Sequence, residues 1–165
     1  MEPERDVKGV LAMPQEEEDT TRTWDGLPIA QTPPFGASIV VYRLAEDRLE
    51  LLVLHRSQKA FDEEWAWTPP SGARQPGETI DDCAMRELLE EAGRTLPLVP
   101  ADGGGEPWAV FLAHAPEAAQ VTLNDPEHDQ YAWLSPHEAL ARCSPDVVRT
   151  QLARAIERIA PGATG

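Results

Sequence analysis

The sequence predicts an α/β fold in which a mixed β-sheet is sandwiched by helices. Three observations predict it: runs rich in aliphatic and β-branched residues come first in the body of the chain, an amphipathic helical pattern follows, and further strand patterns precede two terminal helices. The chain has 165 residues and a hydrophobic content of 41%, enough for one domain with a buried core.

Strand patterns occupy the first half of the body and return after the central helix. The first two runs are separated by turn residues at 45–47 and predict a hairpin. A third, short run stops at Pro69, because proline cannot donate to a sheet ladder, and a loop rich in glycine and proline follows at 71–77. The expected strands are 38–43, 49–55, 65–67, 108–114, 120–123 and 130–134.

Three helices are expected. The first runs from Ile80 to Ala92, where apolar residues recur at helical spacing, and Gly93 is suited to end it. Ser135 and Glu138 have the spacing of a capping box, with proline at the first helical position between them, and predict a short helix. A longer helix is expected to open at Ser144-Pro145-Asp146, and its apolar face is formed by Val148, Leu152, Ala155, Ile156 and Ile159.

The first 34 residues differ from the rest of the chain. They are rich in Glu, Asp, Thr and Pro, with an acidic run at 16–19, and predict a loosely packed extension, 1–34, before a domain that spans 35–161. Trp24 and the segment 27–29 are expected to pin the end of this extension onto the body. A loop rich in glycine at 101–105 is expected to be flexible.

The charge balance narrows the ligands that the protein can take. The chain carries 29 acidic and 14 basic residues, for a net charge of −15. Such a surface repels polyanions, so nucleic acid is excluded as a non-specific partner. A phosphorylated small molecule would also be repelled unless divalent cations bridged it to the protein, which favours a metal-assisted site.

No targeting segment is apparent. The N-terminus lacks the apolar core of a signal peptide, and no run approaches the ~18 apolar residues of a membrane span, so we expect a cytoplasmic protein with no membrane contact. The two cysteines, Cys83 and Cys143, lack metal-ligand spacing and do not form a disulfide framework. Cys83 falls in a helical pattern and is expected to be a small buried side chain.

Three carboxylates share one face of the first predicted helix. Glu87, Glu90 and Glu91 are three and four residues apart, and like charges at this spacing repel by roughly 0.2–0.5 kcal/mol per pair. A hard divalent cation with oxygen ligands would offset that repulsion. The alternative is a solvated helix face with salt bridges, because Arg86 and Glu90, like Glu90 and Arg94, are four residues apart.

The wider pattern resembles the box of the Nudix hydrolase family. That box reads Gly, five residues, Glu, seven residues, Arg-Glu, an aliphatic residue, any residue, Glu-Glu, any residue, Gly and an aliphatic residue. The residues in register are Gly72, Glu78, Arg86, Glu87, Leu88, Glu90, Glu91 and Gly93. Arg94 departs from the pattern, at a point where the helix should already be ending, so we expect it to alter local packing and not metal binding.

The resemblance implies a Nudix-type α/β/α sandwich and attack of water on phosphorus in a nucleoside diphosphate derivative. By position in the box, Glu87, Glu90 and Glu91 resemble metal ligands for Mg²⁺, with Mn²⁺ as an alternative. Gly72, Glu78 and Gly93 take structural positions. Arg86 is expected to hold the loop on the helix through Glu78, with simple surface pairing to Glu90 as the alternative. The predicted catalytic residues are Glu91, Glu127 and Arg86.

Several residues outside the box complete the hypothesis. Glu127 is predicted to be an additional metal ligand or the general base, with His128 as an alternative base and an ordinary loop acid as the alternative for Glu127 itself. Cations near the pocket are candidates for phosphate contact, and Tyr131 is a candidate for stacking on a base. These predicted substrate-binding residues are Arg56, Arg74 and Tyr131, with Lys59 as a further nearby cation. The partner is a small nucleotide, and a homodimer is left open.

The segments 67–72, 76–78 and 127–133 resemble those of asymmetrical diadenosine tetraphosphate hydrolases. Ser71 and Ala73 depart from that pattern, which usually has lysine and histidine there. A dinucleoside polyphosphate is therefore the leading substrate, followed by oxidised nucleoside triphosphates, ADP-ribose and nucleotide sugars. Two other classes compete: a nucleotide sensor without turnover, which loss of box carboxylates would favour, and an acidic interaction protein built on the same fold.

Overall fold

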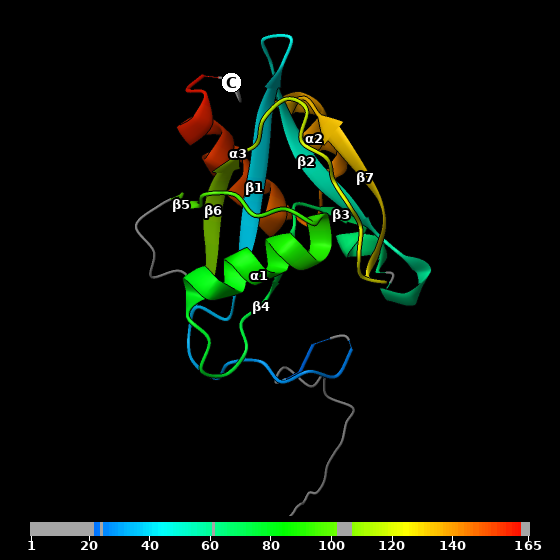
Figure 1. The fold of residues 1–165 in the computed structure, drawn as a ribbon, viewed down its shortest axis with the longest axis vertical. Helices are drawn as coiled ribbons and strands as arrows, with labels where there is room; N and C mark the ends of the chain where they lie inside the picture. Colours follow the sequence, from blue (N-terminus) through cyan, green and yellow to red (C-terminus); the bar gives the residue numbers. More distant parts are fainter. Residues whose placement is uncertain (1–21, 24, 61, 102–106, 163–165) are drawn as a thin grey trace, which may run out of the picture.

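The structure, a computed structural model, describes residues 22–23, 25–60, 62–101 and 107–162. It contains a seven-stranded sheet with helices on both faces (Figure 1). The strands are β1 (Gly36–Ala45), β2 (Arg48–Arg56), β3 (Trp67–Thr68), β4 (Ser71–Ala73), β5 (Val99–Pro100), β6 (Trp108–His114) and β7 (His128–Leu134). The helices are α1 (Ile80–Ala92), α2 (Pro136–Arg142) and α3 (Asp146–Ile159), with 3-10 turns at Gln58–Ala60 and Glu63–Trp65.

The long strand β1 organises the sheet. It pairs antiparallel with β2 and parallel with β6, and the strand order is β3-β2-β1-β6-β5. Two strands pair off this path: β4 joins the start of β1, with Ser71 opposite Ser38, and β7 joins β2. The sheet is mixed, as the sequence predicts, because only the β1–β6 pair is parallel among the pairs described.

Side chains that alternate along β1 fill two cores, one on each face of the sheet. Ile39 and Val41 face α1, whereas Val40 faces α2 and α3. In Figure 1, α1 lies across one face of the sheet and α3 lies behind the other. The α1 side of the first core includes Cys83, Ala84, Leu88 and Ala92, and the α3 side of the second includes Val148, Leu152, Ala155 and Ile156. The predicted α/β/α sandwich is confirmed.

Local signals define the ends of the helices. The Thr79 side chain accepts a hydrogen bond from the Asp82 N–H at the start of α1, and Gly93 ends the helix in the left-handed conformation, at a φ of 68°. The capping box between Ser135 and Glu138 opens α2. The predicted bounds of α1 and the presence of the longer last helix, α3, are confirmed, and Cys83 is buried as a free thiol.

One predicted strand is absent, one is displaced and two short strands were missed. The expected strand 65–67 shares only Trp67 with β3, because Trp65 belongs to the 3-10 turn that precedes it. Residues 120–123 form no strand; instead the Thr122 N–H donates to the carbonyl of Ala92, 2.9 Å away, and Val121 and Leu123 pack on the α1-side core. Their apolar pattern therefore serves an irregular segment that crosses the end of α1. The missed strands are β4, inside the expected loop, and β5.

The extremes of the chain and the expected flexible loop are only partly described. Trp24 and residues 102–106 lie outside the described residues, so the expectations for them are not tested. In the described parts of the chain, none of the helices combines the length and the apolar character that crossing a bilayer requires.

Candidate active site

The loop that joins β4 to α1 packs directly on a carboxylate of the helix. A Cβ atom at Gly72 would lie 2.0 Å from Cδ of Glu87, much closer than any real contact. Glycine is therefore required at this position, because a larger residue would push the loop away from the helix or turn Glu87 out of its place. This is the physical reason for the first glycine of the box.

Arg86 ties the loop to α1. Its Nε donates to Oε2 of Glu78 at 2.7 Å, and one terminal nitrogen donates to Oε1 of Glu78 at 2.9 Å and to the carbonyl of Ala73 at 3.1 Å. The other terminal nitrogen contacts Glu87 at 3.0 Å and Glu90 at 3.3 Å. Both predicted pairings of Arg86 are therefore present. The bidentate bond to Glu78 holds the pKa of that carboxyl below its ordinary value.

Two carboxylates of the box are buried beside each other. Glu91 is 1% exposed and Glu87 is 7% exposed, and the Ser71 N–H donates to Oε1 of Glu91 at 3.0 Å. Burial raises the pKa of Glu87 to about 7, and it raises the pKa of Glu91 well above its ordinary value. Glu127 and Glu87 add to the shift of Glu91 through like-charge repulsion. The side chain of Glu90, by contrast, is 49% exposed.

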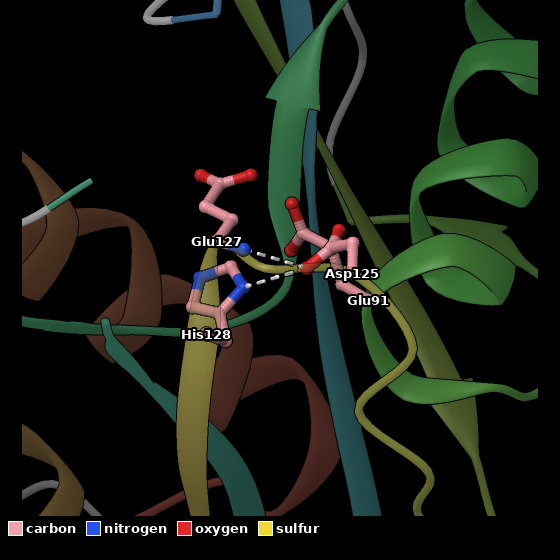
Figure 2. A group of neighbouring side chains, drawn as sticks. All are labelled: Glu91, Asp125, Glu127 and His128. Atoms are coloured by element: carbon pink, nitrogen blue, oxygen red, sulfur yellow. Dashed lines mark hydrogen bonds and ion pairs between the residues drawn. The ribbon is translucent and has the colours of Figure 1, made fainter. Parts of the chain in front are cut away.

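A second segment brings further ligand atoms to Glu91. Glu91, Asp125, Glu127 and His128 each offer one ligand atom, and these atoms lie within 4.8 Å of one another. Figure 2 shows Glu91 coming from α1 and the other three from the loop that enters β7. The Glu127 N–H donates to Asp125 at 3.1 Å, and Nδ1 of His128 lies 3.9 Å from the same carboxylate. Residues 36 positions apart in sequence thus form one group.

This second segment contains site candidates that spacing did not reveal. Asp125 was not among the predicted site residues, and His128 was only an alternative base. Burial raises the pKa of Asp125 and lowers the pKa of His128 to about 4, so the imidazole is neutral at pH 7. No hydrogen-bond partner for Nδ1 of His128 is found in the described part of the protein. In the sequence, the only indication that Asp125 belongs to the site was its position two residues before Glu127.

Several acidic residues of the site, though not Glu91, line one large cavity of about 740 Å³. Its floor includes Glu87, Glu90, Asp125 and Glu127, and the β4 loop and Trp108 form parts of its sides. Arg56 also lines it, with NH1 3.5 Å from Glu127, so this predicted substrate-binding residue lies where it was expected. The volume lies within the roughly 300–1,000 Å³ typical of small-molecule sites.

The other predicted substrate contacts lie elsewhere. The guanidinium of Arg74 donates to the carbonyls of Thr32, Pro34 and Glu78, and its side chain is not among the described residues that line the cavity. Tyr131 is 44% exposed on β7, also outside the described lining. A substrate contact by Arg74 or Tyr131 stays a prediction. The side chain of Lys59 lies outside the described part of the structure.

The residues present fit a divalent cation. Burying several carboxylates together without compensation is costly, and raised pKa values are the sign of that cost. The donor atoms are hard carboxylate oxygens with one imidazole nitrogen, a set that takes small divalent cations. The 4.8 Å spread is close to the separation of opposite ligands of such an ion, about 4.2 Å for Mg²⁺.

The raised carboxyl pKa values predict how the metal-free protein responds to pH. The pKa of Glu87 is about 7 in the folded protein, above its unfolded value of 4.5. The contribution of Glu87 to stability is therefore fully present below pH 4.5 and is lost as pH rises through about 7. The lowered pKa of His128 has the opposite effect on stability, but this effect is confined to pH values below 6.5, the ordinary pKa of histidine. In EDTA, the melting temperature should therefore fall between pH 6.5 and 8. The double variant Glu87→Gln/Glu91→Gln should flatten this slope, and an equal slope in the variant would contradict the assignment.

The fold is an α/β/α sandwich with an acidic cavity on one side, and comparison with known families gives its class. The NUDIX domain family model matches residues 33–157, so the chain belongs to the Nudix hydrolase family. It is a Nudix pyrophosphohydrolase, an enzyme class that cleaves diphosphate linkages in nucleoside diphosphate derivatives.

Particular relatives narrow the comparison. The chain is 29% identical, over 117 residues, to the asymmetrical bis(5'-nucleosyl)-tetraphosphatase of Caenorhabditis elegans, covering 64% of this chain and 81% of that protein. A crystal structure titled as a binary complex of the C. elegans Ap4A hydrolase has 27% identity and a TM-score of 0.62, over 76% of this chain and 96% of that one. The MutT protein of Methanosarcina mazei, at 23% identity, TM-score 0.57 and coverage of 76% and 94%, shows the fold alone.

Proposed function

We propose that this enzyme hydrolyses dinucleoside polyphosphates, with diadenosine tetraphosphate as the leading substrate, in a reaction that depends on Mg²⁺ or, as an alternative, Mn²⁺. The observation that carries the proposal is the unbroken set of box carboxylates on α1: Glu87 and Glu90 line one cavity together with Glu127, and Glu91 is buried beside them. The choice of substrate is supported by the similarity to the asymmetrical bis(5'-nucleosyl)-tetraphosphatase of Caenorhabditis elegans.

In this proposal the carboxylates of Glu87, Glu90 and Glu91 hold the cation, with Asp125 and His128 beside them. A cation held there would neutralise phosphate oxygens and would lower the pKa of a water that it binds. Arg86 keeps the loop on α1 through Glu78 and so maintains the positions of the two buried carboxylates. Arg56 contacts a phosphate oxygen, because it is a cation in the described lining of the cavity and carries a buried Nε with no hydrogen-bond partner there.

Glu127 is the general base in this mechanism. Its carboxylate lies 3.5 Å from Arg56 and lines the same cavity as Glu87 and Glu90 of α1. It therefore reaches a water that lies between Glu127 and the helix. The proton passes from that water to the Glu127 carboxylate as the water oxygen attacks phosphorus. The P–O bond opposite the attacking oxygen breaks, and its bridging oxygen leaves with the second nucleotide.

The test is a panel of nucleotide diphosphate derivatives, each assayed with Mg²⁺ and with EDTA, with products separated by chromatography. Diadenosine tetraphosphate should be the preferred substrate and should yield ATP and AMP in equal amounts. Two molecules of ADP would contradict the asymmetric cleavage, and preference for ADP-ribose or a nucleoside triphosphate would replace the proposed substrate. Binding without turnover of any member would favour a sensor.

A further inference from the structure

The N-terminal arm, which we define as residues 25–35, forms one wall of the acidic cavity. Asp25, Leu27, Pro28, Ile29 and Phe35 all line that cavity. In Figure 1 the arm, drawn in blue, passes beneath α1 on the same side as the loop between β4 and α1. Most of the arm precedes the segment that matches the family, which begins at residue 33.

Arg74 fixes the arm in place through backbone bonds. Its guanidinium donates to the carbonyls of Pro34 at 2.7 Å and Thr32 at 2.6 Å, and also to the Thr32 hydroxyl at 3.1 Å. The Arg74 carbonyl accepts from the Ala30 N–H at 2.7 Å, and Ala30 is buried. At the end of the arm, the Phe35 N–H donates to the carbonyl of Pro107 at 2.7 Å. The arm is thus hydrogen-bonded to Arg74 along its length and to Pro107 at its end.

The chemistry of this wall differs from that of the catalytic floor. The floor is made of carboxylates and suits cations and phosphate, whereas Leu27, Pro28 and Ile29 present apolar groups to the same space. Leu27 is 48% exposed, which leaves a large apolar side chain facing an open cavity. An apolar wall gives no stabilisation to a phosphate group, but it does stabilise the flat, uncharged face of a base. The cavity therefore has separate sides for the two halves of a nucleotide.

We infer that the arm is a specificity-determining wall: its apolar segment Leu27–Ile29 packs against the base of the nucleotide substrate, and Arg74 is the positioning residue that holds the segment there. This inference rests on the proposed nucleotide substrate. It gives Arg74 an indirect role, because the guanidinium is bonded to the arm and to Glu78 and not aimed at the cavity.

The experiment compares two ligands that differ only by the base. Binding of AMP and of ribose 5-phosphate to the full-length protein is measured by calorimetry with Mg²⁺, and turnover is not needed. Leu27→Ser should weaken AMP about tenfold, which is the effect of losing roughly half of a leucine's burial, and should leave ribose 5-phosphate unchanged. Leu27→Met should restore AMP binding. Leu44→Ser is the matched control, because Leu44 is 51% exposed at the far end of β1, outside the described lining.

Arg74→Met separates positioning from phosphate contact. If Arg74 acts through the arm, this variant weakens AMP and leaves ribose 5-phosphate unchanged, and adding it to Leu27→Ser gives little further loss. An equal loss of both ligands would overturn the positioning role. Melting curves of each variant identify those that fail to fold. If Arg74→Met fails to fold, Leu27→Ser provides the test.

A neighbouring cavity supplies the competing location for the base. It has about 190 Å³, lies between the sheet and α3, and is lined by Val40, Trp108, Val110, Val148 and Leu152. If Val148→Phe removes the preference for AMP and Leu27→Ser does not, the base lies in that cavity and the inference about the arm is overturned. If diadenosine tetraphosphate is not hydrolysed but Leu27→Ser still weakens AMP alone, the arm's role stands and the proposed substrate falls.

Discussion

Replacing Glu91 by glutamine should reduce metal-dependent turnover by orders of magnitude, roughly 10²- to 10⁴-fold, while the fold stays intact. The two effects separate because of where Glu91 lies. It is 1% exposed and its neighbours Glu127 and Glu87 repel its charge, so the carboxylate is costly to bury without a cation. Glutamine keeps an oxygen for the bond from the Ser71 N–H and removes the buried acid.

The measurement pairs steady-state kinetics with thermal unfolding. In EDTA the variant should melt no lower than the parent at pH 8, whereas added Mg²⁺ should raise the melting temperature of the parent more than that of the variant. Asp82→Asn is the matched control, since it makes the same chemical change on the exposed side of the same helix, and it should change neither quantity. Unchanged turnover in Glu91→Gln would remove Glu91 from the mechanism.

Replacing Arg86 by methionine should destabilise the fold by about 1–3 kcal/mol, less than for a fully buried ion pair, because the side chains of Arg86 and Glu78 are 23% and 13% exposed. Arg86 makes a bidentate bond to Glu78, whose side chain is only 13% exposed, and it also contacts the Ala73 carbonyl, Glu87 and Glu90. The variant leaves the Glu78 carboxylate unpaired and frees the loop. The free energy of unfolding in urea measures the loss.

Two further measurements identify the cause of that loss. The double variant Arg86→Met/Glu78→Gln should recover part of it, because residue 78 no longer carries an unpaired charge. The difference between Arg86→Met and the parent should shrink as pH falls below 4.5, since the lowered pKa of Glu78 contributes stability only above that value. Arg86→Lys should not restore full stability, because a single ammonium cannot reproduce the planar fork. A loss independent of pH and unrelieved in the double variant would contradict this account.

The placement of the acids explains why a box with so many like charges is compatible with a stable helix. Glu78 is neutralised by Arg86, and Glu90 extends toward solvent beside the same guanidinium. Glu87 and Glu91 instead lie under the loop, where burial raises the pKa of each. Without a cation these two groups reduce stability at neutral pH. Binding of a cation reverses that cost, so metal binding and folding stability are linked.

The sequence by itself determined the parts of the protein that depend on local spacing. Three features depend only on neighbours within a few residues, so the sequence alone shows them. They are the helical repeat from Ile80 to Ala92, the glycine that ends it and the capping box at Ser135. The box placed Glu87, Glu90 and Glu91 on one helix for the same reason. Strand runs with strong β preference were also readable, and β6 has the predicted bounds.

Only the tertiary structure decided which distant segments meet. It brought Asp125 and His128 to Glu91 by closing β7 onto β2, and nothing within that loop signals its distance from the helix. It showed that Val121 and Leu123 belong to an irregular segment and pack against the core, because packing of alternate side chains leaves the same apolar pattern whether or not a strand forms. It also assigned Arg74 to the arm, since the backbone carbonyls that satisfy a guanidinium carry no side-chain signature in the sequence.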